Sequence, residues 1–279
     1  MLPRPLQMRA GAVLGRLLYL IASRRRHIAA VNLKLCFPEL SDDERKQLLK
    51  RHFAALGISL LETGNAWWCP HEKIKMLVAN FNGADYVREA LASGRSVLLI
   101  GAHFTTLEIS NALFRAAFET PISIIYRPHE NPVVDWMYRH QRERHTTQAI
   151  ARDDMRSLVK LLRQNAVVWY APDQNYGLKN SVFAPFFGVP AATNTSATRL
   201  ARSTGCVVIP FVSKRLADNR YEINMLPPFE NFPSEDPQAD ATQINLALEK
   251  ALRGMPEQYL WVHRRFKDRP PGEQDVYAR

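Results

Sequence analysis

Hydrophobic and polar positions follow two different periods along the chain, and the changes of period separate helices from strands. Short apolar runs predict buried strands at 96–101, 122–126, 166–170, 206–212 and 221–226. Apolar residues recur at helical spacing between them, in 85–92, 104–118, 131–145, 153–164, 194–203 and 238–252. Strands that alternate with helices predict an α/β fold with a mostly parallel central sheet flanked by helices.

The region before this alternation is predicted to be helical. Ser41 and Glu44 form an S-x-x-E capping pattern, and apolar residues follow at helical spacing through Leu56. Residues 180–198 carry no charge but contain Pro185 and Pro190, so we expect a loop there. No repeat or convincing linker interrupts the chain, which predicts a single domain overall, with residues 1–31 as a membrane-associated segment of it and 32–279 as its main body.

Residues 9–31 have the pattern of a basic amphipathic helix. The arginines gather on one side and the larger apolar residues on another: Arg9, Arg16 and Arg24 against Leu14, Leu17, Leu18 and Ile21. A helix of this kind can lie in the interface of an anionic membrane. The same pattern also fits a helix packed on the core with its arginines in water. No run of 18 apolar residues predicts a membrane-spanning helix.

The charge balance and the cysteine content of the chain limit which binding partners and metal sites are expected. The 37 Lys and Arg residues exceed the 27 Asp and Glu residues, giving a net charge of +10. Such a surplus favours an anionic partner, which can be nucleic acid, a membrane surface or an acidic protein. Three widely spaced cysteines exclude a disulfide scaffold and argue against a zinc site, so no metal is expected. The usual nucleic-acid, nucleotide, serine-hydrolase and zinc-protease signatures are absent.

One pair of residues carries candidate chemistry. His103 follows the strand 96–101, and Glu108 lies five residues later, within the first turns of the next helix. Ligands of open α/β sheets bind at the carboxyl ends of the strands. A carboxylate that orients an imidazole allows the other ring nitrogen to act as a general base. The alternative is a structural histidine beside the sheet.

Further charged residues follow the predicted strands. Arg127, Arg142 and Asp173 can line one crevice above the sheet, or they can be ordinary surface charges. Arg264 and Arg265 belong to a basic run, 263–269, that is either an anion-binding patch or a solvated tail.

Several blocks of sequence, taken in order, resemble the late acyltransferases of lipid A biosynthesis, of the lauroyl acyltransferase type. The resemblance extends from about residue 23 to residue 272. It rests on residues 32–39, 62–64, 101–108, 126–132 with 135–136, 168–174, 186–188 and 258–267.

The resemblance implies an activity and a place. An acyl chain would move from an acyl carrier protein thioester to a hydroxyl on the acyl chains of a Kdo-lipid IVA-type precursor of lipid A. The reaction would occur at the cytoplasmic face of the inner membrane, against its anionic surface, and would need no cofactor and no nucleic acid. His103 and Glu108 match the catalytic pair of the family. The expected substrate-binding residues are Arg127, Asn131, Arg142, Asp173, Arg264 and Arg265.

Three departures from the family pattern are visible. A hydrophobic membrane helix usually precedes the basic stretch, so either the start is truncated or the helix at 9–31 provides the anchor. Ser196 stands where glycine is common, and Asp268 where threonine is common. Two other readings stay open: a glycerophosphate or other glycolipid acyltransferase with the same His–acid pair, and a non-catalytic basic protein that binds membranes.

Overall fold

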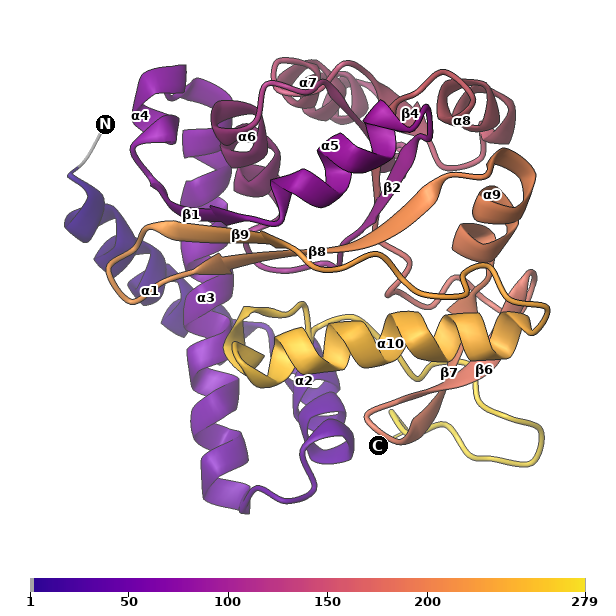
Figure 1. Ribbon diagram of the computed structural model, residues 1–279. Helices are drawn as coiled ribbons and strands as arrows, with labels where there is room; N and C mark the ends of the chain where they lie inside the picture. The colour runs from indigo at the N-terminus through magenta and orange to yellow at the C-terminus, as the bar shows by residue number, and fades with distance from the viewer. Residues whose placement is uncertain (1–2, 279) are drawn as a thin grey trace.

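The computed structural model describes residues 3–278, and its centre is a seven-stranded sheet (Figure 1). The strand order is β1-β9-β8-β2-β5-β3-β4. The strands are β1 (Val78–Asn82), β2 (Val97–Ile100), β3 (Ile122–Tyr126), β4 (Ala149–Ala151), β5 (Val167–Tyr170), β8 (Val207–Arg215) and β9 (Tyr221–Met225). Every neighbouring pair is parallel except β8 and β9. The predicted α/β class with a mostly parallel sheet is confirmed.

Ten α-helices and one 3₁₀ helix surround this sheet within residues 3–278. They are α1 (Arg4–Ile21), α2 (Ser23–Cys36), α3 (Asp42–Trp68), α4 (His71–Lys75), α5 (Ala84–Ala92), α6 (Leu107–Ala117), α7 (Pro132–Glu143), α8 (Met155–Leu162), α9 (Ser196–Thr204), α10 (Pro237–Arg253) and η1 (Pro256–Gln258). The predicted capping box begins α3, since the Glu44 amide donates to Ser41 Oγ at 3.3 Å. The helices predicted from residue 85 onward are all present.

Two apolar cores lie on opposite faces of the sheet. Side chains alternate along a strand, so Leu98 and Ile100 of β2 join one core while Val97 and Leu99 join the other. Helices α2, α9 and α10 cover the first face, and α5 and α6 cover the second (Figure 1). Burial on both faces explains why these strands are short, continuous apolar runs.

The prolines of segment 180–198 predicted a loop, but the segment forms an antiparallel hairpin. β6 (Ser181–Phe186) pairs with β7 (Val189–Asn194) as a separate two-stranded sheet. Phe187 and Gly188 form a two-residue turn with φ of 51° and 74°, which suits the twist of a hairpin. Pro185 and Pro190 face each other in the register, and a two-stranded ribbon tolerates them because both of its strands are edges.

The predicted basic helix at 9–31 is two helices, because Ala22 leaves the helical conformation with φ −87° and ψ 58°. Helix α1 packs against α3 through small residues. A Cβ atom added to Gly57 of α3 would lie 2.2 Å from both the Gly11 oxygen and the Gly15 nitrogen of α1. The helix is therefore packed on the core, yet five of its large apolar side chains stay exposed: Leu6, Val13, Leu17, Leu20 and Ile21. Within residues 3–278, no helix is long and apolar enough to cross a membrane.

Candidate active site

The loop after β2 holds His103 beside the end of β5. The Gly101 amide donates to the Tyr170 carbonyl at 2.9 Å, which extends the β2–β5 ladder by one residue. A Cβ atom on Gly101 would lie 2.4 Å from Trp169 Nε1, so only glycine permits this approach. The loops that follow β2 and β5 are thereby brought together.

His103 is paired with Asp173, the carboxylate that follows β5. The two are joined twice: ring Nδ1 lies 2.7 Å from Asp173 Oδ1, and the His103 amide donates to Oδ2 at 3.0 Å. Asp173 is only 1% exposed. Burial alone would raise its pKa, but the His103 ring and these hydrogen bonds hold the pKa of Asp173 below its usual range. The carboxylate therefore accepts the Nδ1 proton and leaves Nε2 as the basic nitrogen.

Glu108 has a different partner from the one expected. Its carboxylate accepts two hydrogen bonds from the Arg142 guanidinium, one of them from Nε at 3.2 Å. Within the described residues, Glu108 forms no hydrogen bond with His103. The prediction that Glu108 orients His103 is wrong, because Asp173 occupies Nδ1 and Glu108 faces α7. Burial alone would lower the pKa of Arg142, but the negative charge of Glu108 and its hydrogen bonds outweigh burial and raise this pKa above its usual value.

A cavity of about 780 Å³ opens beside His103 at the carboxyl ends of β3 and β5. Part of its wall is apolar, with side chains from β3, α6, α8, β5 and α9: Ile124, Leu107, Leu158, Trp169 and Leu200. Another part is cationic: Arg127, Arg142, Arg152, Lys179 and Arg199. Asp153 is the acidic residue of the lining. The cavity thus brings together an apolar surface, an anion-attracting surface and an imidazole oriented by a carboxylate.

This arrangement and the sequence comparisons point to the same family. Residues 1–268 match the bacterial lipid A biosynthesis acyltransferase family. The chain belongs to this family. It is 40% identical to the lipid A biosynthesis lauroyltransferase of Escherichia coli K12 over 278 residues, which is 99% of this chain and 90% of the relative. It is 37% identical to the palmitoleoyltransferase of the same organism, with the same coverage. The myristoyltransferase is 29% identical over 99% of this chain and 84% of its own length.

The acyltransferase uses some of the predicted binding residues for structure. Arg265 is 2% exposed and donates to the Ala192 carbonyl at 2.6 Å and to Thr193 Oγ1 at 2.8 Å. A buried guanidinium with these partners holds the β7 strand in place, so the prediction that Arg265 binds substrate is wrong. Arg264 pairs with Asp275 at 2.8 Å, and it does not line the cavity.

Of the two predicted binding residues near the start of α7, one lines the cavity and the other has a structural role. Arg127 lines the cavity at its exposed rim, as expected. Asn131 instead caps α7, where its side-chain oxygen accepts from the Val133 amide at 3.0 Å and the Val134 amide at 3.3 Å. Asn131 does not line the cavity. Its place in the acyltransferase is the start of the helix that carries Arg142.

Residues 258–263 also support the site, although the sequence, which marked this block only by its family resemblance, did not show which loops it contacts. The Leu260 amide donates to the His103 carbonyl at 3.0 Å, and the Thr105 amide donates to the Gln258 carbonyl at 2.7 Å. On the other loop, the Asn175 amide donates to His263 Nε2 at 3.1 Å. The segment thus supports both halves of the His103–Asp173 pair.

His263 is suited to this supporting role. Burial lowers its pKa to about 4, which keeps Nε2 unprotonated and able to accept from the Asn175 loop. The sequence showed a histidine in a basic run but gave no sign of which loop it reaches. Within residues 3–278, no group of three His, Cys, Asp or Glu side chains could hold a metal ion.

Proposed function

We propose that this acyltransferase moves a fatty acyl chain, lauroyl or similar, from an acyl carrier protein thioester to a hydroxyl on the acyl chains of a Kdo-lipid IVA-type precursor. The observation that carries the proposal is the His103–Asp173 pair at the wall of a cavity that is partly apolar and partly cationic. The apolar part suits a fatty acyl chain. The cationic part suits the phosphates and sugar acids of the acceptor.

The reaction is a direct displacement. Asp173 holds the Nδ1 proton of His103, and Nε2 removes the proton of the acceptor hydroxyl. The resulting oxygen attacks the thioester carbonyl, a C–O bond forms, and the C–S bond breaks. The thiolate leaves with the proton that the imidazolium returns. No protein acyl intermediate forms.

Arg142 is the proposed donor to the oxyanion that develops on the thioester carbonyl. It lines the cavity with His103, and Glu108 fixes its Nε and Nη2 atoms. A positioned donor of this kind contributes about 10²–10³ in rate. Glu108 therefore acts through Arg142, as a positioning residue.

The enzyme is proposed to lie on the cytoplasmic face of the inner membrane. The exposed apolar side of α1 and the neighbouring exposed Arg9 and Arg16 support this, because such a surface enters the interface of an anionic bilayer. The acceptor lipid is a component of that bilayer.

The test is replacement of His103 by alanine, with transfer to the purified lipid A precursor measured by mass spectrometry. We expect the rate to fall by about 10²–10⁴, because the general base is lost. His71→Ala, at an exposed position of α4, is the matched control and should transfer at the normal rate. A folded His103→Ala protein with normal activity would refute the mechanism.

Two further incubations examine the other parts of the proposal. With donor alone, no acylated protein should accumulate, and a covalent adduct would reveal a Ser, Thr or Cys nucleophile. With glycerol 3-phosphate in place of the lipid A precursor, no product should form. Efficient transfer to glycerol 3-phosphate would favour the glycerophosphate reading.

A further inference from the structure

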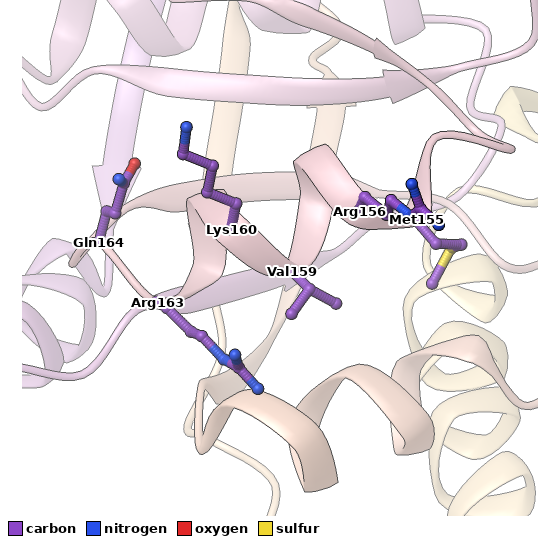
Figure 2. Close-up of a pocket in the computed structure, with 6 residues that line it drawn as sticks. All are labelled: Met155, Arg156, Val159, Lys160, Arg163 and Gln164. Atoms are coloured by element: carbon purple, nitrogen blue, oxygen red, sulfur yellow. The ribbon is translucent and has the colours of Figure 1, made fainter.

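Helix α8 and its C-cap residue carry a row of basic side chains. Arg156, Lys160 and Arg163 follow one another at helical spacing, and all three are exposed. Together with Met155 they line a shallow groove, in which Arg163 is directed toward the neighbouring helix (Figure 2). That helix is α9, since Arg163 donates to the Ser203 carbonyl at 3.3 Å. The groove therefore extends along α8 beside α9.

No side chain of this row forms a salt bridge within residues 3–278. Neither Arg156 nor Lys160 forms a salt bridge or a side-chain hydrogen bond in the described part of the chain. The nearby Asp154 caps α8, where it accepts from the Ser157 amide at 3.1 Å, and its charge interacts with Arg156 without forming an ion pair. By contrast, Arg253 on α10 is paired with a glutamate. The α8 row is left to attract an external anion.

The groove adjoins the catalytic cavity. Met155 lines both, so the groove and the cavity meet at this side chain. Arg152, Lys179 and Arg199 continue the positive charge along the cavity wall. A partner seated on α8 would thus have its bound acyl group at the entrance to the space that contains His103.

The character of the surface favours a protein over a bilayer. Exposed large apolar side chains accompany the arginines of α1, as membrane insertion requires. On α8 and α9, no large apolar side chain is exposed. The apolar side chains that line the groove, Met155 and Val159, are only partly exposed, whereas its basic side chains are exposed. A surface of this kind matches an acidic protein held by charge complementarity.

We propose that the outer side of α8 (Arg156, Lys160 and Arg163) is the docking surface for the acidic protein that carries the acyl thioester. This inference rests on the proposed function, in which an acyl carrier protein is the donor. Docking there presents the thioester to the cavity past Met155.

The experiment compares two donors with the same acyl chain, lauroyl carried by acyl carrier protein and lauroyl pantetheine, which lacks the acidic protein. Arg156→Glu/Lys160→Glu reverses two charges four residues apart. We expect kcat/KM for the protein-borne donor to fall about tenfold or more, through KM, and to become less sensitive to salt. The rate with lauroyl pantetheine should not change.

The matched control is Lys46→Glu/Lys50→Glu, which makes the same charge change at the same spacing on the exposed side of α3. It should leave both donors unaffected. Equal losses with both donors, or an equal loss in the control, would overturn the docking surface. So would a variant that loses binding to phosphatidylglycerol vesicles while its KM for the protein-borne donor stays normal, because the row would then face lipid.

A binding measurement separates this inference from the proposed function. Fluorescence anisotropy of labelled lauroyl acyl carrier protein should show binding to the wild-type enzyme and at least tenfold weaker binding to Arg156→Glu/Lys160→Glu. If the wild type binds but transfers no acyl chain, the proposed reaction fails and the docking surface stands. If the wild type transfers from lauroyl pantetheine but does not bind the carrier protein, the docking surface fails and the chemistry stands.

Discussion

At the scale of single residues, two carboxylates near the reacting centre have separate tasks. Asp173 is buried and is bonded to both the ring and the amide of His103, so it fixes the tautomer and the position of that side chain. Glu108 is bonded to Arg142. The proposed general base and the proposed oxyanion donor are therefore each held by a carboxylate of their own.

This division predicts the outcome of a double-mutant cycle. Asp173→Asn should lower kcat about 10³-fold or more, because an amide can stabilise the wrong tautomer of His103. Since Asp173 works through His103, the double variant with His103→Ala should be no slower than His103→Ala alone. Glu108→Gln works through Arg142, so it should reduce the residual activity of His103→Ala further. Steady-state kinetics of the three single variants and the two double variants provide the test. If Glu108→Gln adds no loss to His103→Ala while Asp173→Asn does, then Glu108, and not Asp173, acts through His103.

At the scale of elements, the contact between α1 and α3 depends on three glycines. Gly11 and Gly15 of α1 meet Gly57 of α3 with no space for a side chain between the helices. Such a close approach lets the backbones pack directly and fixes α1 on the body of the protein.

We expect Gly57→Ala to displace α1, because its Cβ atom would overlap backbone atoms that cannot move independently. The free energy of unfolding should fall by about 1–3 kcal/mol, as for other overpacked contacts. Gly64→Ala on the same helix is the control, since its Cβ would be 3.5 Å from the Trp68 ring and makes ordinary contact. Urea denaturation of both variants measures the difference. Equal stability of the two would show that α1 is not held by this contact.

The sequence predicted those elements whose pattern is strong and local. The central strands β2 and β5 were predicted within one residue, since both of their faces are buried and their apolar runs are continuous. The edge strands β1 and β4 were missed. β1 has only half-buried or exposed residues and β4 has three residues in all, so neither has a distinctive pattern. The β6–β7 hairpin was missed because prolines usually indicate a loop.

The candidate site was found in the right loop but with the wrong partner. Sequence spacing brought His103 and Glu108 together, whereas Asp173 reaches His103 because β2 and β5 are neighbours in the sheet. A pairing across 70 residues is a property of the strand order. The same applies to Arg265, whose partners lie in β7. Composition and local periodicity contain no record of such contacts.

At the scale of the whole molecule, two exposed surfaces differ in kind. Helix α1 presents large exposed apolar side chains beside arginines, whereas α8 has exposed basic side chains and no large apolar side chain that is fully exposed. Part of the basic surplus thus lies on the surface that we propose for a bilayer, and part on the surface that we propose for an acidic protein.

Membrane attachment through α1 is testable with Leu17→Glu/Leu20→Glu, at side chains that are 52% and 67% exposed. The change removes apolar surface and adds charges that an anionic bilayer repels, so sedimentation with phosphatidylglycerol vesicles should fall at least tenfold. Leu246→Glu on α10, where the leucine is 55% exposed, is the control and should sediment normally. Unchanged sedimentation of the α1 variant would place the contact elsewhere.

The support of both catalytic loops by residues 258–263 has a consequence for how the enzyme is made. During translation, β2 and β5 leave the ribosome and can begin to pair long before this segment exists. A nascent or prematurely terminated chain that lacks it holds His103 and Asp173 without their braces at Leu260 and His263. We therefore expect full activity to be acquired late in synthesis, and a chain that ends before this segment to lose activity through misplacement of the His103–Asp173 pair.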